Sequence, residues 1–199
     1  MVRSSVGTKL YLGVMAIFLL FAVSFIVFQH DREKRYKIDV LDTRLQDYNE
    51  CMAEVLAMNR NMTEKAIDAY VKDHYEPDMR VTVIDMKGRV IFDNKYKDYA
   101  RLENHLGRDE VRQALRQGSG YDIDRKSSTM GQSYFYSATS FPRQRFIIRT
   151  ALPYNDSLAR TLRTDQHYVW FALLAMVLLT VTLYRFTRRL GMNVMKLRT

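Results

Sequence analysis

The sequence is poor in cysteine and proline, and its two ends contain no acidic residues. A single cysteine, Cys51, excludes an internal disulfide framework and any metal site built from several cysteines. All 22 acidic residues lie between Asp31 and Asp165, and the same stretch holds 24 of the 31 lysines and arginines. The basic surplus therefore belongs mainly to the ends rather than to one folded surface, which argues against a nucleic-acid partner.

Two uncharged apolar runs are long enough to cross a membrane. Leu10–Phe28 has 19 residues and would span roughly 28 Å as a helix, close to a hydrocarbon core of about 30 Å. Tyr168–Tyr184 has 17 residues, and the aromatic residues at its ends are typical of membrane interfaces. We therefore predict transmembrane helices over residues 10–28 and 167–185. The alternative for the first run is a cleaved signal peptide with a small-residue site at Ala22–Ser24.

Basic residues beside the two runs predict the orientation of the chain. They lie in the short flanks 1–9 and 186–199, which contain no acidic residue. Short, positively charged flanks stay in the cytoplasm, so we expect both termini there. Residues 29–166 then form an extracytoplasmic domain. In a bacterium, this describes a two-pass protein of the inner (cytoplasmic) membrane with a periplasmic or extracellular central domain.

Residues 29–58 are predicted to form one long helix that follows the first apolar run. Apolar residues recur at alternating intervals of three and four, and charged residues such as Asp42 and Arg44 occupy the other faces. The apolar stripe consists of Ile38, Leu41, Leu45, Tyr48, Met52 and Val55. Periodicity alone does not identify the surface against which such a stripe packs. The stripe packs on the chain's own domain, is shared with a second copy in a homodimer, or does both.

The rest of the central domain predicts short helices and five strands. Asn61 and Glu64 have the spacing of a capping box for a second helix that should end near His74. Acidic residues at the start and Gly118 at the end predict another helix over Asp109–Gln117. Alternating apolar residues between turn signals predict strands over 80–85, 89–93, 120–124, 132–140 and 145–152.

This order of elements predicts an α+β fold. The first two strands, joined by a turn at Gly88, carry apolar residues on both faces, so both faces of the sheet should be covered. We expect a five-stranded antiparallel sheet with the long N-terminal helix on one side and the loop 94–119 on the other. Leu158 and Leu162 belong to a final helix that should continue into the second membrane span without a break.

Three stretches carry a resemblance to a known family. They are Arg80–Asp93 (RVTVIDMKGRVIFD), Leu102–Val111 (LENHLGRDEV) and Tyr134–Ala138 (YFYSA). Together with the order of helices and strands, they resemble the PAS-like extracytoplasmic domains of two-component sensor histidine kinases of the phosphate-regulon sensor type. The chain departs from the family pattern at Leu102 and Asp109, where the family has Met and Pro.

The resemblance implies the partners and output of a longer parent protein. There, a cytoplasmic kinase core would follow the sensor and act on a response regulator. Residues 186–199, with Leu190, Val194 and Leu197 spaced four and three apart, look like the start of a HAMP-like signalling helix. The chain itself contains no phosphoacceptor-histidine or nucleotide-binding motif. We therefore expect no catalytic residue, no enzyme activity and no cofactor in this chain.

The candidate ligand-binding residues fall into two groups. Asn104, His105 and Arg108 form a polar cluster where the loop meets the short helix, and Tyr134 and Tyr136 point to one face of their strand. The cluster either fixes the loop or forms one wall of a ligand pocket, and the tyrosines are either core residues or pocket lining. The four histidines show no metal-ligand spacing, so we expect no metal site.

Three functions agree with this sequence. The first is the signal-sensing and transmembrane part of a two-component sensor histidine kinase, with a small molecule or a protein as its signal. The second is the same sensor coupled to a chemoreceptor or a cyclic-dinucleotide enzyme. The third is a structural, membrane-anchored periplasmic protein without a ligand. A polar cavity in the central domain would favour the two sensor functions over the third.

Overall fold

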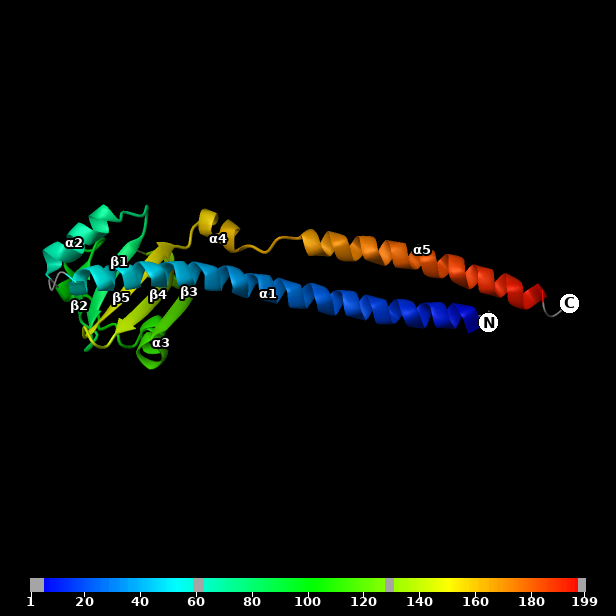
Figure 1. Cartoon of the computed structure of the whole chain (residues 1–199), viewed down its shortest axis with the longest axis horizontal. Coiled ribbons are helices and arrows are strands. Elements are labelled where there is room, and N and C mark those ends of the chain that lie inside the picture. The colour runs from blue at the N-terminus through cyan, green and yellow to red at the C-terminus, as the bar shows by residue number, and fades with distance from the viewer. Residues whose placement is uncertain (1–5, 59–62, 128–130, 197–199) are drawn as a thin grey trace. The chain divides into compact units, whose positions relative to one another are not determined.

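The computed structural model describes residues 6–58, 63–127 and 131–196. It contains two compact units, one formed by residues 37–162 and the other by the described parts of 1–36 and 163–199. Figure 1 shows the elements in chain order, which are α1 (Val6–Met58), α2 (Glu64–Asp73), β1 (Arg80–Asp85), β2 (Val90–Asp93), the 3-10 helix η1 (Tyr99–Arg101), α3 (Asp109–Gln117), β3 (Ser119–Lys126), β4 (Ser133–Phe141), β5 (Phe146–Pro153), α4 (Asp156–Leu162) and α5 (His167–Lys196).

The central unit is built on one antiparallel sheet with the strand order β2-β1-β5-β4-β3. Each neighbouring pair is antiparallel, and β1 and β5, in the middle, pair along six successive positions from Arg80↔Ala151 to Asp85↔Phe146. The predicted α+β fold, with a five-stranded antiparallel sheet and a long N-terminal helix, is confirmed. The boundaries of β1 are those predicted, and the boundaries of the other four strands differ from the predicted ones by one or two residues.

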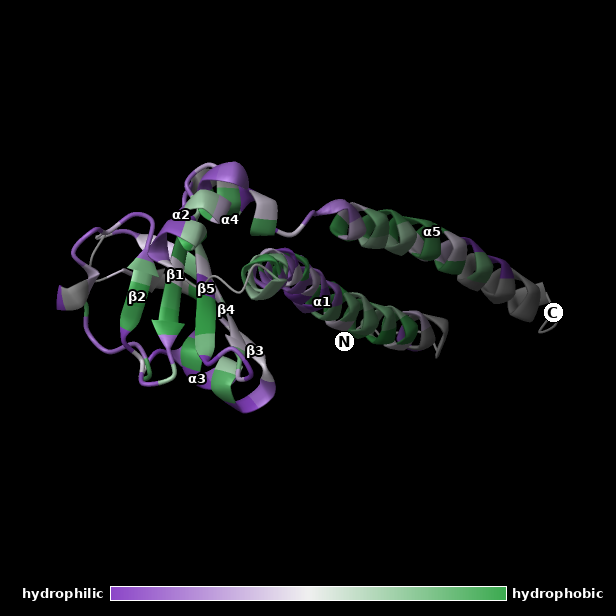
Figure 2. Ribbon diagram, turned by 60° about the vertical axis from the view of Figure 1, so that its left-hand side comes forward, coloured by the Kyte–Doolittle hydropathy of each residue, from purple (hydrophilic) through white to green (hydrophobic). Residues whose placement is uncertain are grey.

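One face of the sheet packs against α1 and α2. Successive side chains of a strand point to opposite faces, so Val81 and Val83 of β1 meet the helices while Arg80 and Thr82 face away. The main core unites this sheet face with buried residues of both helices, including Met52 and Ile67. Figure 2 shows apolar colour over much of β1, β2 and β5, with paler or purple stretches at their polar residues.

The other face is shared between α3 and the loop before it. Val111 and Ala114 of α3 pack on Ile84 of β1 and Ile147 of β5. Gly120 of β3 permits this close approach, because a Cβ there would lie 2.2 Å from Gln113 Cβ and 2.7 Å from the Glu110 carbonyl oxygen. The part of this face not covered by α3 lies under the loop of residues 94–108, and the candidate site is there.

The apolar stripe of α1 packs on the chain's own sheet. Ile38, Leu45 and Met52 are buried in the main core, and Leu41 and Tyr48 pack against it. Val55, the last residue of the predicted stripe, is 38% exposed. The stripe is therefore covered within one copy, and a homodimer would need a different face of α1.

The assignment of Asp42 to the solvent-facing side of α1 was wrong. The residue is 7% exposed and points at β4, where the Ser137 hydroxyl donates a hydrogen bond of 2.5 Å to its carboxylate. Two turns later, Asn49 donates a hydrogen bond of 3.1 Å to the Thr139 hydroxyl of the same strand. The sequence pattern missed this because a polar residue that finds a buried partner can occupy a core position.

Two predicted helix boundaries were also wrong. The cap of α2 is Thr63, whose side chain accepts a hydrogen bond from the Ala66 N–H, whereas the predicted cap Asn61 lies outside the described residues. The final helix does not run unbroken into the second span, because α4 ends at Leu162 and α5 begins at His167.

The other unit consists of two apolar helical segments. The N-terminal part of α1 and the helix α5 are long and apolar enough to cross a membrane, and their apolar residues are visible in Figure 2. At one end of this unit, the Thr164 hydroxyl lies 2.8 Å from His30 Nδ1, and the Asp165 N–H donates a 2.8 Å hydrogen bond to Glu33. Leu197 lies outside the described residues, as do the side chains of Leu190 and Val194.

Candidate functional site

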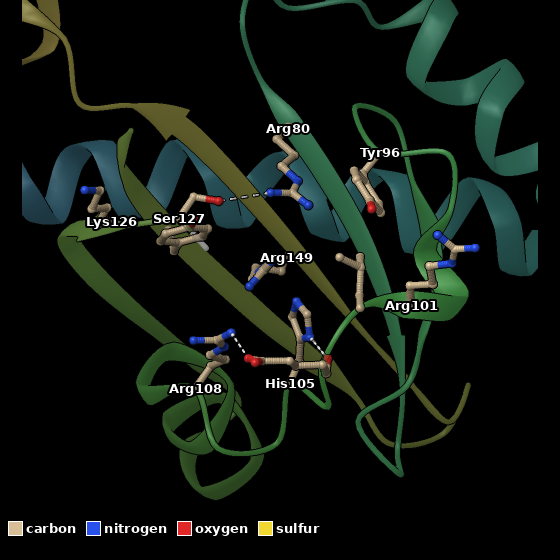
Figure 3. A pocket seen from close by; sticks show the side chains of 11 residues that line it. Arg80, Tyr96, Arg101, His105, Arg108, Lys126, Ser127 and Arg149 are labelled. Atoms are coloured by element: carbon tan, nitrogen blue, oxygen red, sulfur yellow. Dashed lines mark hydrogen bonds and ion pairs between the residues drawn. The ribbon is translucent and has the colours of Figure 1, made fainter. Parts of the chain in front are cut away.

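A cavity of about 200 Å³ opens between the sheet and the loop of residues 94–108. By volume it would hold roughly six or seven water molecules, so it suits a small ligand. We call it the cationic pocket. It is lined by Arg80, Tyr96, Arg101, Leu102, Glu103, His105, Arg108, Lys126, Ser127, Tyr136 and Arg149, and Figure 3 shows these side chains.

Arg80 of β1 forms one part of the pocket floor. Its Nε and Nη2 atoms each lie 2.9 Å from Asp93 Oδ2, and its Nη1 donates a 3.4 Å hydrogen bond to Ser127. Asp93 also accepts hydrogen bonds from the Thr82 hydroxyl and from the backbone N–H groups of residues 95 and 96. Both charged side chains are almost fully buried. Arg80 is therefore held by a carboxylate whose own hydrogen bonds fix its position.

Arg149 of β5 forms the adjoining part of the floor. Its Nη1 lies 3.2 Å from the buried carboxylate of Glu110 on α3, and its Nη2 donates a 3.3 Å hydrogen bond to Thr82. The guanidinium carbon lies 4.8 Å from the centre of the Tyr136 ring, in cation–π geometry. Two guanidinium groups on adjacent central strands are thus fixed beneath one small cavity before any ligand arrives.

His105 forms the wall on the loop side and is 5% exposed. Its Nδ1 lies 2.6 Å from the carbonyl oxygen of Glu103, so Nδ1 carries the proton and Nε2 is left as an acceptor. In Figure 3 the other ring nitrogen points toward Arg149. Burial, and then the positive charge of Arg149, lowers the pKa of His105 to about 4, so the ring is neutral near pH 7.

The rim of the pocket is also basic. Arg108 is partly exposed and pairs at 3.1 Å with the more exposed carboxylate of Glu103. Arg101 is exposed and pairs with Asp98 at 2.9 Å. Among the side chains that the structure describes, Lys126 has no acidic partner. Five cationic side chains and one carboxylate line the cavity, so its chemistry favours a small anion.

The predicted site residues lie in two different places. His105, Arg108 and Tyr136 line the cationic pocket. Tyr134 is not part of the lining, but its ring lies 5.8 Å from that of Tyr136 and its hydroxyl accepts a hydrogen bond from Gln132. Asn104 is also outside the lining, and its side chain contacts the β1–β2 turn instead.

The side chain of Asn104 ties the loop to this turn. Its Nδ2 donates a 2.7 Å hydrogen bond to the Lys87 carbonyl, and its Oδ1 accepts one of 2.9 Å from the Leu106 N–H. Gly88, at φ +84, provides the space, since a Cβ there would lie 2.2 Å from Asn104 Oδ1. The cluster was predicted either to fix the loop or to form a pocket wall. Asn104 fixes the loop, whereas His105 faces the cavity.

Sequence reasoning missed the two floor arginines. Arg80 begins the strand sequence RVTVID, and Arg149 interrupts the apolar run RFIIRTAL. An arginine within an otherwise buried strand requires an acidic partner, and this requirement was the available signal. The partners, Asp93 and Glu110, become neighbours only through strand register and helix packing, which the sequence pattern does not give.

The described residues contain no group of three or more histidine, cysteine, aspartate or glutamate side chains that could hold a metal ion. The groups that line the pocket are instead guanidinium groups, hydroxyls and an imidazole. Among its described side chains, we find no nucleophile placed beside a general base.

Comparison with known proteins gives a similarity of fold. No protein-family model matches the sequence, and no curated protein matches it. The YkuI protein of Bacillus subtilis, which has an EAL domain and was crystallised with its substrate cyclic di-GMP and calcium, is 12% identical with a TM-score of 0.52. The match covers 64% of this chain and 35% of that one, so the chain spans about a third of the length of YkuI.

Two sensor domains are among the other matched structures. The periplasmic sensor domain of a chemotaxis protein is 17% identical, with a TM-score of 0.39 over 64% of this chain and 99% of that one. A Cache chemosensory domain, whose structure was described as a basis for carboxylic acid recognition, is 12% identical, with a TM-score of 0.41 over 62% of this chain and 95% of that one.

Proposed function

We propose that this chain is the signal-sensing and transmembrane part of a two-pass membrane receptor, and that its signal is a small anion bound in the cationic pocket. The observation that carries the proposal is the pair Arg80 and Arg149, two buried guanidinium groups on adjacent strands facing one cavity. A planar guanidinium offers paired N–H donors that fit a carboxylate, phosphate or sulfate group. A purely structural membrane anchor has no need of such a cavity.

Signalling follows if the anion favours one of two arrangements of the domain. Arg149 reaches the pocket from β5 and holds α3 through Glu110. An anion beside Arg149 would compete with the Glu110 carboxylate and so change how α3 and the loop pack on the sheet. The central domain is connected to two apolar helical segments. One is the N-terminal part of α1, and the other is α5, which follows α4.

The output belongs to a longer parent protein in this proposal. The stretches Arg80–Asp93 and Leu102–Val111 support a histidine kinase core as the output domain. Its partner would be a response regulator, and residues 186–199 would be the start of a HAMP-like helix. The comparisons give no support to the phosphate-regulon type, so we keep the proposal at the level of a PAS-like or Cache-like sensor. A chemoreceptor or a cyclic-dinucleotide enzyme, the second of which has a counterpart in the EAL domain of YkuI, is the alternative output.

Thermal unfolding of the full chain in lipid nanodiscs tests the proposed signal. Sulfate, phosphate, succinate and citrate are compared with sodium chloride at equal ionic strength. A ligand at 100 times its Kd stabilises the folded state by about 2.7 kcal/mol, so at least one dianion should raise Tm by several degrees. If none raises Tm above the chloride control, the anion signal is wrong.

The membrane topology needs a separate test. A reporter that is active only outside the cytoplasm should be active when fused near Lys126 and silent when fused after Thr199. Equal activity at both positions would contradict the two-pass arrangement with cytoplasmic termini, whatever the result of the anion measurements.

A further inference from the structure

His105 has one ring nitrogen committed to the protein and the other available in the pocket. The 2.6 Å contact from Nδ1 to the Glu103 carbonyl fixes the ring and its tautomer. The other nitrogen points toward Arg149 across the cavity (Figure 3). The ring is 5% exposed, so the cavity is the route by which a proton or a ligand reaches Nε2.

The groups around His105 explain why the ring is neutral near pH 7. They are Glu103 and Arg108 on its own loop, Glu110 on α3, Arg149 on β5, Arg80 on β1 and Lys126 on β3, while Tyr136 of β4 contributes a ring and a hydroxyl. Burial, together with the nearby cations, disfavours a positive charge on the imidazole. Glu110 opposes them, but its carboxylate is engaged with Arg149.

An anion in the cavity reverses this balance. Its negative charge would neutralise the field of Arg149 and Arg108 and would offer an acceptor for a second N–H on the ring. We propose that His105 is a proton-coupled ligand-binding residue, which takes up one proton at Nε2 when an anion binds and then donates a hydrogen bond to it. This inference rests on the proposed function of the pocket, and it adds that the receptor responds jointly to an anion and to acidity.

Thermodynamic linkage between proton and anion binding gives the direction and size of the pH dependence of anion affinity. Binding that raises the pKa of His105 must itself become tighter as pH falls through the range between the free and bound pKa values. With a free value of about 4 and a bound value of about 6, affinity would increase about fourfold between about pH 7.5 and about pH 5.5. The proton comes from solvent and forms the Nε2–H bond, so binding takes up one proton without other covalent change.

Sulfate is the best probe, because it remains a dianion throughout this pH range while succinate and citrate titrate. The full chain in nanodiscs, with isotope-labelled histidine, has only four imidazoles, and His105→Gln identifies the resonance of interest. Saturating sulfate should raise the pKa of His105 by about two units and leave those of His30, His74 and His167 nearly unchanged. Sulfate affinity, measured at both pH values, should show the severalfold gain.

The outcomes separate this inference from the proposed function. Sulfate that binds without moving the pKa of His105, and with equal affinity at both pH values, overturns the proton coupling and leaves the anion pocket standing. Failure of sulfate, phosphate, succinate and citrate alike to bind overturns both proposals. His105→Gln should bind sulfate with an affinity that no longer depends on pH. Should that variant fail to fold, the wild-type titration and pH series still decide.

Discussion

The Ser137 hydroxyl on β4 donates a 2.5 Å hydrogen bond to the Asp42 carboxylate on α1, and this contact joins the long helix to the sheet from inside the core. Gln46, one turn along α1, donates a second hydrogen bond of 2.6 Å to Asp42. Burial raises the pKa of Asp42 above its ordinary value despite these two donors, so the folded domain retains a proton there more readily than the unfolded chain.

Asp42→Asn should therefore stabilise the chain at neutral pH. In the wild type, the stabilisation from a raised carboxyl pKa is present at low pH and is lost as pH rises through the folded value. Asparagine keeps the acceptor for Ser137 without a charge, so we expect a gain of about 1 kcal/mol, or roughly 2–4 °C in Tm. Asp42→Ala is the control, and it should destabilise by about 1–3 kcal/mol because Ser137 loses its partner. A fall in Tm for both variants would contradict this account.

His105 should make the domain less stable in acid. Its folded pKa of about 4 lies below the ordinary value of 6.5, so the unfolded chain binds more protons between these two pH values. Stability should then fall by up to about 3 kcal/mol as pH drops from about 6.5 to about 4. Chemical unfolding of the wild type and of His105→Gln across this range measures the difference. Parallel pH profiles of the two proteins would contradict the buried, neutral ring.

Arg108→Ala should weaken anion binding while the domain stays folded. Arg108 is partly exposed at the pocket rim and its ion pair with Glu103 faces solvent, so its loss costs about 0–1 kcal/mol of stability. Anion affinity should fall by about tenfold, the size expected for one charge-assisted hydrogen bond. Arg112, paired with Asp109 and outside the pocket lining, is the matched control. Equal effects of Arg108→Ala and Arg112→Ala on affinity would remove Arg108 from the site.

Asn104→Ala should show the opposite behaviour. Its amide fixes the loop to the β1–β2 turn through the Lys87 carbonyl and the Leu106 N–H. We expect a loss of about 1–3 kcal/mol in unfolding free energy. Anion affinity of the folded fraction should change little. Gly88→Ala should destabilise as well, since its φ is +84 and its Cβ would collide with Asn104. A large change in affinity with normal stability would place Asn104 in the binding site instead.

The homodimer remains a prediction, and the structure changes how it should be tested. In a Cys51→Ser background, a cysteine at Leu45 should not cross-link two copies, because that position is 1% exposed. A cysteine at Val40, which is 52% exposed on the same helix, should cross-link if the copies meet along α1. Disulfide formation in membranes, read on a non-reducing gel, measures both. No cross-linking at Val40 would argue against a dimer through this face.

The sequence predicted best what depends on local pattern. The two apolar runs, the stripe on α1 and the alternating strands are each visible within a short stretch of sequence. The helix Asp109–Gln117 was predicted with its observed boundaries, because its acidic start and the glycine after its end are local signals. The pocket floor depends on long-range pairing. Thr82 lies opposite both Asp93 on β2 and Arg149 on β5, a relationship that exists only once the strand order is known.

The unbroken backbone of α1 has a mechanical consequence. At about 1.5 Å per residue, its 53 residues form a rod of roughly 80 Å that resists torsion along its whole length. Asp42 and Asn49 attach one part of this helix to β4, and the same uninterrupted ladder of backbone hydrogen bonds continues from there into the apolar segment. The second connection to the central unit is interrupted between Leu162 and His167, so its ladder of helical hydrogen bonds is broken where that of α1 is continuous.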